Sequence, residues 1–197
     1  VTGTLPYAAD NAIAAAVNVG ASGIGVTATA SNSTTLNLLT AAGALTFNLN
    51  GQAVSTTVAD KNDLSNLVSA INGVAATTGV TATFTSTSAK NDITLTTTDG
   101  RNISLENFAN GTAGNDSISF GGTVLTEGGQ ISAIKTGTVE LSSTKGAIAT
   151  AGADATVFAG AGVNNSTFAA VAAIDISSFA GASAALSVID SALSQVN

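Results

Sequence analysis

Residues 67–106 read LVSAINGVAATTGVTATFTSTSAKNDITLTTTDGRNISLE. Four apolar residues lie around the start of this stretch, at positions i, i+3, i+4 and i+7: Leu64, Leu67, Val68 and Ile71. That spacing puts them in one stripe and predicts a short amphipathic helix, which we place at Asp60–Asn72. Asp60 is placed to cap its start, and Gly73 can adopt the left-handed conformation that ends a helix.

Downstream of this helix the pattern changes to strict alternation, which is typical of strands with one packed and one wet face. The alternating apolar sets are Val80, Ala82 and Phe84; Ile93 and Leu95; Ile103 and Leu105; and, earlier in the chain, Leu45, Phe47 and Leu49. Asn50-Gly51 and Asp99-Gly100 carry the residues that two-residue hairpin turns prefer. We therefore expect a hairpin at each of these two positions.

The chain also contains an internal repeat. Residues 16–29, AVNVGASGIGVTAT, align without gaps to residues 70–83, AINGVAATTGVTAT, at an offset of 54. Leu39-Thr40 matches Leu95-Thr96, and the turn before 44–49 matches the turn before 101–106, at offsets of 56 and 57. We expect each copy to form a helix, a turn and a β-meander, with the first helix at Asp10–Val19.

Residues 107–165 are richer in glycine and less regular. Short strands are expected at Ile118/Phe120, Ile131–Ile134 and Val139/Leu141, and a loop-rich return segment at 146–165. The predicted fold is mainly β with a few short helices (α+β) and elongated. Its expected parts are a duplicated β-rich domain (1–106), a variable Gly-rich segment (107–173) and the start of a helical region (174–197).

The helical pattern at the carboxyl end has a heptad-like spacing. Its apolar residues follow one another at intervals of three and four: Phe179, Ala182, Leu186, Ile189, Leu193 and Val196. This spacing is the seam of a helix that packs along other helices. We expect Phe179, Leu186, Ile189, Leu193 and Val196 to form an assembly seam, whose bland alternative is an ordinary surface helix.

These features together resemble a known family. Residues 67–106 are similar to the flagellin insertion motif: a helix ending in Ile-Asn, a Gly-Val-Thr-Ala strand, Leu-Thr, and Asp-Gly-Arg-Asn-Ile. Residues 174–197, IDISSFAGASAALSVIDSALSQVN, are similar to the start of the flagellin carboxyl-terminal core region. The resemblance implies a subunit of the bacterial flagellar filament, an extracellular structural protein of motility and surface display.

The resemblance also implies a division of labour within such a subunit. Residues 1 to about 173 would form the projecting, antigenic part, and 174–197 would begin the core-proximal helices. Its partners would be other flagellin subunits, contacted through terminal regions mostly absent here. We expect the chain to be a fragment of a longer protein, since it begins at Val1 without methionine and its heptad seam breaks off at Asn197.

Composition excludes several classes of function. The chain has no Cys, His, Trp or Met, so no Ser–His–Asp or Cys–His pair and no zinc site built on His or Cys can form. Five basic against 12 acidic residues give a net charge of −7, which argues against binding to nucleic acid. No apolar run reaches the roughly 18 residues that span a bilayer. We expect no enzyme activity, no cofactor and no membrane insertion.

Sharper alternatives rest on single features. Residues 111–119, GTAGNDSIS, resemble one copy of a calcium-binding nonapeptide with Asp116 as a ligand, but such sites need stacked copies, so a β-turn is favoured. Four acids could be imagined as glycosidase pairs: Asp92, Asp99, Glu106 and Asp116. The alternative function is a glycan-binding or adhesive cell-surface module, for which Tyr7 is the only Trp or Tyr ring. Three sequons, at Asn32, Asn102 and Asn110, are expected to be chance matches.

Overall fold

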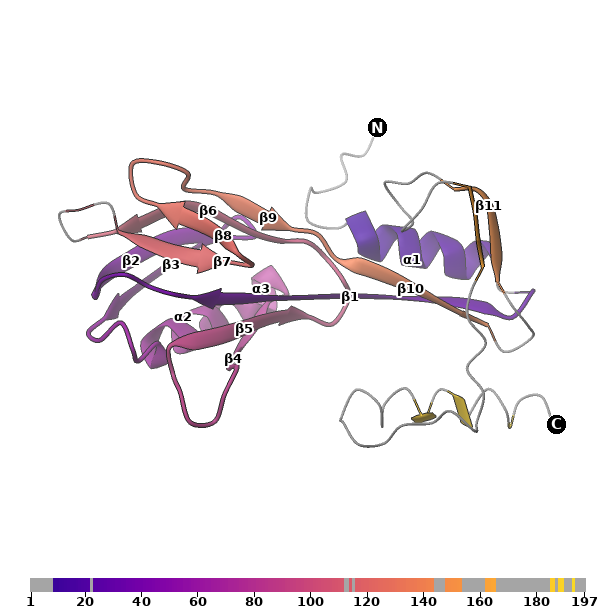
Figure 1. Cartoon of the computed structure of the whole chain (residues 1–197), viewed down its shortest axis with the longest axis horizontal. Helices are drawn as coiled ribbons and strands as arrows, with labels where there is room; N and C mark the ends of the chain where they lie inside the picture. Colours follow the sequence, from indigo (N-terminus) through magenta and orange to yellow (C-terminus); the bar gives the residue numbers. More distant parts are fainter. Residues whose placement is uncertain are drawn as a thin grey trace. The chain divides into compact units, whose positions relative to one another are not determined.

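The computed structural model describes residues 9–21, 23–111, 114, 116–143, 148–153, 162–165, 185–186, 188–189 and 193. In these residues the protein is mainly β with a few short helices, which confirms the predicted fold class (Figure 1). The chain divides into two compact units: Val1–Ala14 with Thr29–Val139, and Ala15–Ala28 with Glu140–Asn197.

Most strands belong to two sheets. Five strands of the larger sheet follow the order β4 (Thr81–Phe84), β5 (Asp92–Thr97), β1 (Val26–Asn37), β7 (Ser117–Phe120) and β8 (Thr123–Thr126), and β10 (Thr138–Ser143) also pairs with β1. The smaller sheet has the order β3 (Gln52–Val58), β2 (Gly43–Leu49), β6 (Ile103–Asn110) and β9 (Ala133–Lys135). The pairs of the smaller sheet are antiparallel, as are β4–β5, β5–β1, β1–β7 and β7–β8.

One hydrophobic core takes side chains from both sheets and from the helix α2 (Ser65–Gly73). Its fully buried members include Leu36 of β1, Leu45 and Leu49 of β2, Leu67 and Ile71 of α2, Ile93 and Leu95 of β5, and Ile103 and Leu105 of β6. Burying each such side chain contributes about 1.5–3 kcal/mol. The apolar positions that the sequence pattern selects are therefore the positions that hold the two sheets and α2 together.

The two predicted hairpin turns have different outcomes. Asn50 (φ 47°) and Gly51 (φ 81°) both have positive φ and join β2 to β3, which pair directly, so this hairpin is confirmed. The hairpin predicted at Asp99-Gly100 is wrong, because β5 belongs to the larger sheet and β6 to the smaller one. Here the turn carries the chain from one sheet to the other.

The helices lie close to their predicted positions, but the predicted start of the second helix and the left-handed conformation predicted for Gly73 are wrong. The first helix, α1, spans Ala9–Gly20, as expected. The second, α2, begins at Ser65 rather than near Asp60, because Asp63 Oδ1 accepts the Ser65 N–H at 3.0 Å while Asp60 Oδ1 accepts from Asn62. Gly73 does not have positive φ; the left-handed residue is Gly79 (φ 71°), which follows the short helix α3 (Ala75–Thr78).

Each of the aligned segments 16–29 and 70–83 contains the same side-chain contact, made within the segment. Asn18 Nδ2 donates to the Ala28 carbonyl at 2.8 Å, and Asn18 Oδ1 accepts the Ala28 N–H at 2.7 Å. Asn72 makes the same two bonds with Ala82, at 2.9 and 2.8 Å. Asn18 and Ala28 are the counterparts of Asn72 and Ala82 at the offset of 54. We call each of these pairs an amide clamp.

Beyond the amide clamps the two copies diverge. After Ala82 the chain turns back at Phe84 and returns as β5, whereas after Ala28 it runs straight on as the 12-residue strand β1. The β-meander predicted for the first copy is therefore wrong. Between the matching pairs Thr29/Thr83 and Leu39/Leu95 the second copy has 11 residues and the first has nine, and in the first copy most of these residues continue the strand β1 instead of forming a loop.

The described residues between 107 and 165 are more regular than their composition suggests. The predicted strands near Ile118, Ile134 and Leu141 are confirmed as β7, β9 and β10. The loop-rich segment expected at 146–165 is wrong in part, since β11 (Ala149–Ala153) and β12 (Gly162–Asn165) form an antiparallel pair. The expected boundary at residue 106 falls inside β6, and β7, β8 and β9 complete the two sheets.

Candidate functional site

The crossover between the two sheets depends on a glycine that cannot be replaced without displacing backbone. Gly100 has φ 72°, a conformation that side chains disfavour. A Cβ on Gly100 would lie 2.3 Å from the Ala30 Cβ and 2.6 Å from the Ala30 carbonyl carbon. The Asp99-Gly100-Arg101 turn can therefore pass this close to β1 only because residue 100 is glycine.

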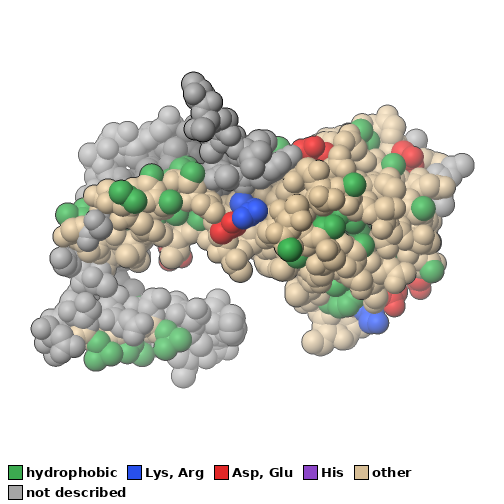
Figure 2. Space-filling view, turned by 180° about the vertical axis from the view of Figure 1, so that it is seen from behind, with side chains coloured by type: hydrophobic (Ala, Val, Ile, Leu, Met, Phe, Trp, Pro, Cys, Tyr) green, Lys and Arg blue, Asp and Glu red, His purple; other side chains and the backbone are tan. Residues whose placement is uncertain are grey.

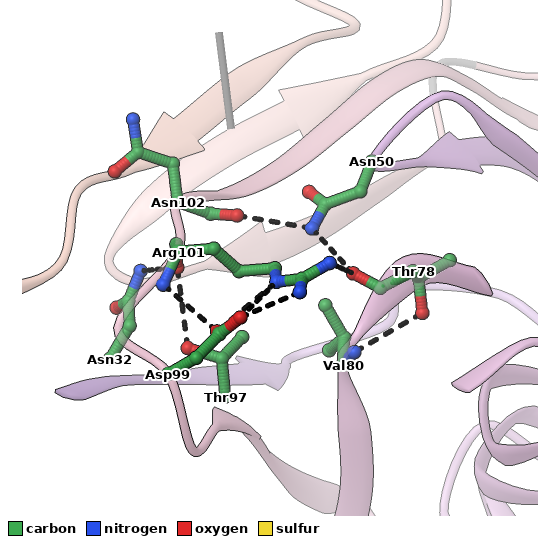
Figure 3. A network of polar contacts seen from close by, with 8 residues as sticks. All are labelled: Asn32, Asn50, Thr78, Val80, Thr97, Asp99, Arg101 and Asn102. Atoms are coloured by element: carbon green, nitrogen blue, oxygen red, sulfur yellow. Dashed lines mark hydrogen bonds and ion pairs between the residues drawn. The ribbon is translucent and has the colours of Figure 1, made fainter. Parts of the chain in front are cut away.

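Arg101 is held by the carboxylate two residues before it (Figure 3). Its Nη2 lies 2.6 Å from Asp99 Oδ2, and its Nε donates to Oδ2 at 2.8 Å and to Oδ1 at 3.1 Å. Hydrogen bonding to Arg101 is the main cause that lowers the pKa of Asp99, against some desolvation. The same hydrogen bonds raise the pKa of Arg101. Both groups are charged at neutral pH, so Asp99 cannot serve as a general acid.

The guanidinium also reaches the end of α3. Arg101 Nη1 donates to the Thr78 carbonyl at 3.4 Å, and Asn50 Nδ2 donates to the same oxygen at 3.0 Å. The Asn50 side chain makes two more hydrogen bonds: its Nδ2 donates to the Asn102 carbonyl at 3.0 Å, and its Oδ1 accepts the Ser104 N–H at 2.7 Å. The tip of the β2–β3 hairpin is thus bonded to α3 and to β6.

Arg101 also provides a backbone acceptor for the larger sheet. Its carbonyl accepts from Asn32 Nδ2 at 3.0 Å and from Thr97 Oγ1 at 3.2 Å. Asn32 Nδ2 donates in addition to the Lys135 carbonyl at 2.9 Å. We call the residues drawn in Figure 3 the crossover network; it joins β1, β5, the β2–β3 hairpin, α3 and the segment that leads into β6. Its members are Asn32, Asn50, Thr78, Val80, Thr97, Asp99, Arg101 and Asn102. Its hydrogen bonds connect elements that are distant along the chain, so its role is structural: it holds these elements together.

Sequence reasoning missed Asn32 and Asn50 as members of this network. The Asn-Gly pair at 50–51 signals only the turn, and Asn32 stands out only as part of a sequon. Their partners are distant along the chain, with Asn32 and Lys135 separated by 103 residues. No local pattern could have identified them.

Two of the other acids considered for catalysis accept a hydrogen bond from a nearby hydroxyl, and for Asp116 the contact is made by its backbone. Asp92 Oδ1 accepts the Thr85 hydroxyl at 3.1 Å, and Glu106 Oε1 accepts the Ser104 hydroxyl at 2.7 Å. The Asp116 carbonyl accepts the Glu127 N–H at 3.0 Å. Across the described residues no three acids gather where they could hold a metal ion, so the calcium site at Asp116 stays a prediction that gains no support here.

The three sequon asparagines are buried. Asn32 donates within the crossover network, Asn110 Nδ2 donates to the Ala41 carbonyl at 3.1 Å, and Asn102 Oδ1 accepts the Gly137 N–H at 3.3 Å. In the folded protein these three amides are structural side chains. Tyr7, the aromatic ring considered for sugar binding, lies outside the described residues.

The predicted assembly seam is described only in part. Leu186, Ile189 and Leu193 are helical and 64%, 42% and 58% exposed. Phe179 and Val196 lie outside the described residues. Charged side chains are few and scattered on the face of the molecule drawn in Figure 2. The described part of the predicted seam therefore presents large apolar side chains to solvent at heptad spacing.

A comparison with known protein families gives a match within the two-sheet part of the chain. Residues 44–99 match the model of the flagellin hook IN motif, which covers β2, β3, α2, α3, β4 and β5. The match overlaps the stretch 67–99 on which the sequence resemblance rests, and it supports a flagellin-type protein, a class that is structural. No curated protein matches the chain. Among the described residues no helix is both long and apolar enough to cross a membrane.

Proposed function

We propose that this chain, whose residues 44–99 carry the flagellin hook IN motif, is the projecting, surface-exposed part of a bacterial flagellar filament subunit. The observation that carries the proposal is the motif match itself, which falls on the unit built from β2, β3, α2, α3, β4 and β5. The crossover network connects elements of that region, and apolar side chains of both sheets and α2 are buried in its core. These contacts are structural, as expected of a filament subunit.

The geometry suits display and assembly. The loop between β4 and β5, residues 85–91, is exposed throughout and rich in Ser and Thr, so it can vary without touching the core. The helical residues Leu186, Ile189 and Leu193 offer apolar surface suited to helical partners in neighbouring subunits. In this proposal the protein is extracellular, acts with other flagellin subunits and has no reaction of its own.

Surface labelling of the intact organelle tests the proposal. The chain has no cysteine, so Ser88→Cys in the exposed loop creates a single reactive thiol. We expect a membrane-impermeant maleimide to label this variant along the whole filament. Ile71→Cys, fully buried in α2, is the matched control and should stay unlabelled until the filament is denatured.

Two results would contradict the proposal. Label confined to the short hook segment at the base of the filament would place the chain in the hook. Label on the cell body in a strain with unlabelled flagella would favour the alternative, an adhesive or glycan-binding surface module.

A further inference from the structure

Three asparagines of this chain are followed directly by glycine, at Asn50-Gly51, Asn72-Gly73 and Asn110-Gly111. Asparagine is a chemically labile residue. It is most labile before glycine, because glycine has no side chain to hinder an attack by its own backbone nitrogen on the asparagine amide. In the folded protein all three side-chain amides are hydrogen-bonded. The fold therefore determines which of the three pairs can react.

Two of the three pairs are held by the smaller sheet. The Asn50 side chain makes hydrogen bonds to the end of α3, to the segment before β6 and to β6 itself, so its release requires the β2–β3 hairpin to separate from these elements. Asn110 lies in β6 and is 0% exposed. The nitrogen that would attack it is also engaged, because the Gly111 N–H donates to the Ala44 carbonyl at 2.9 Å.

The third pair lies at the end of a helix. Asn72 and Gly73 are the last two residues of α2, and both are exposed. The amide clamp holds Asn72 by two hydrogen bonds to Ala82. Helical backbone conformation keeps the Gly73 nitrogen away from the Asn72 amide carbon, so a reaction requires the helix end to open. The end of a nine-residue helix opens at a much lower cost than a sheet.

We propose that Asn72-Gly73 is a site of spontaneous deamidation in the folded protein. When the end of α2 opens, the Gly73 backbone nitrogen attacks Asn72 Cγ, and the new C–N bond closes a succinimide ring. The bond between Cγ and Nδ2 breaks, and Nδ2 leaves as ammonia with the proton that the Gly73 nitrogen gives up. Water then opens the ring and leaves aspartate or isoaspartate at position 72. The product has a carboxylate in place of the amide that donates to the Ala82 carbonyl.

The first copy of the repeat contains the same clamp without the labile pair. Asn18 binds Ala28 by the same two hydrogen bonds, but the residue that follows Asn18 is Val19, which aligns with Gly73 at the offset of 54. A β-branched side chain is bulky next to the backbone and hinders the attack. Ageing of the protein should therefore loosen α2 from β4 and leave the clamp of the first copy intact.

Peptide mass spectrometry of the aged protein tests the proposal. Trypsin cleaves after lysine and arginine, so the three pairs fall on three different peptides, 1–61, 62–90 and 102–135. The folded 197-residue chain is incubated at mildly alkaline pH and sampled over time. Conversion at Asn72 should be at least about fivefold faster than at Asn50, Asn110 or Asn18, because only a local opening is needed. In denaturant the three Asn-Gly pairs should react at similar rates.

Gly73→Ala is the matched control. Gly73 does not have positive φ, and a Cβ there would meet nothing within 4 Å, so this variant keeps the fold. It should slow the conversion of Asn72 at least about tenfold and leave Asn50 and Asn110 unchanged, since the added methyl group hinders only the neighbouring attack. Equal rates at Asn72 and Asn110 in the folded protein would show that the reaction follows global unfolding. That result, or unchanged conversion of Asn72 in Gly73→Ala, would overturn the proposal.

Discussion

Asn72 and Ala82 are joined by two hydrogen bonds between one side-chain amide and one backbone residue. Nδ2 donates to the Ala82 carbonyl at 2.9 Å, and Oδ1 accepts the Ala82 N–H at 2.8 Å. The asparagine amide thus presents to β4 the donor and acceptor that a neighbouring strand would present. Only asparagine and glutamine side chains carry a carbonyl oxygen and an amide N–H together, as a backbone peptide does.

The first prediction concerns this clamp. Asn72→Asp keeps the shape and one acceptor but loses the donor to the Ala82 carbonyl, so we expect the free energy of unfolding to fall by about 1–2 kcal/mol. Urea unfolding followed by circular dichroism measures it, since the chain has no tryptophan. Asn91→Asp, in the exposed loop between β4 and β5, is the matched control. Equal stability of the two variants would show that the clamp contributes nothing.

The second prediction concerns the crossover between sheets. Gly100→Ala combines a positive φ with a contact on the Ala30 backbone that cannot move aside. We expect a loss of more than about 3 kcal/mol, because overpacking adds to the backbone strain of about 1–2 kcal/mol. Gly122→Ala has φ 86° but meets nothing within 4 Å, so it should cost the strain alone. Thermal unfolding measures the loss of stability in each variant. Equal losses in Gly100→Ala and Gly122→Ala would contradict this account.

The third prediction is a dependence on pH. Because the pKa of Asp99 is lower in the folded than in the unfolded protein, its contribution to stability is present above the unfolded value, about 4. The contribution disappears as the pH falls through the lower, folded pKa. In Asp99→Asn the free energy of unfolding should therefore fall less steeply with decreasing pH below about pH 4 than in the parent protein.

The size of this effect is limited by solvent. The Asp99 and Arg101 side chains are 31% and 35% exposed, so we expect the ion pair itself to contribute no more than about 1 kcal/mol. Arg101→Gln should remove the same pH-dependent component, and adding Asp99→Asn to it should change the pH profile no further. An acid profile that retains its slope in Asp99→Asn would assign the effect to other carboxylates.

The fourth prediction uses two buried threonines as a matched pair. Thr34 is 6% exposed, and its hydroxyl has no hydrogen-bond partner in the described structure. Thr34→Val should raise the free energy of unfolding by about 1 kcal/mol, since it removes a buried polar group at constant shape. Thr78→Val should lower the free energy of unfolding, because the Thr78 hydroxyl donates to the Val74 carbonyl and accepts the Val80 N–H. Destabilisation by both substitutions would show that Thr34 has a partner.

Local sequence pattern predicted the elements of this fold but not how they join. The stripe at Leu67 and Ile71 and the alternation at Ile93 and Leu95 are buried as expected, because periodicity reports which face meets the core. The Asp99-Gly100 turn shows the limit of such reasoning. Its residues suit a hairpin, yet β5 and β6 each have a different neighbour that lies far away in the chain.

The crossover network was out of reach of the sequence for the same reason. Asn50 bonds to Ser104, 54 residues away, and Asn32 bonds to Arg101, 69 residues away. Asparagine is also common in turns, so the residue type alone does not distinguish a buried, hydrogen-bonded asparagine from one in an exposed loop. Asn18 and Asn72 could have been found, since they are identical residues at matching positions of the repeat.

The last prediction concerns assembly and depends on the proposed function. Leu186, Ile189 and Leu193 are helical, exposed and spaced by three and four residues, so they form one stripe. If neighbouring subunits bury this stripe, each side chain contributes about 1.5–3 kcal/mol to association, and a carboxylate in its place opposes burial. Leu186→Asp and Leu193→Asp in the full-length subunit should each raise the concentration needed for seeded polymerisation at least tenfold, as measured by sedimentation. Ser187→Asp adds the same charge one position along the chain from Leu186, off the heptad spacing, and should polymerise like the parent protein. Normal polymerisation of the leucine variants, or equal failure of Ser187→Asp, would show that this stripe is ordinary surface rather than an assembly seam.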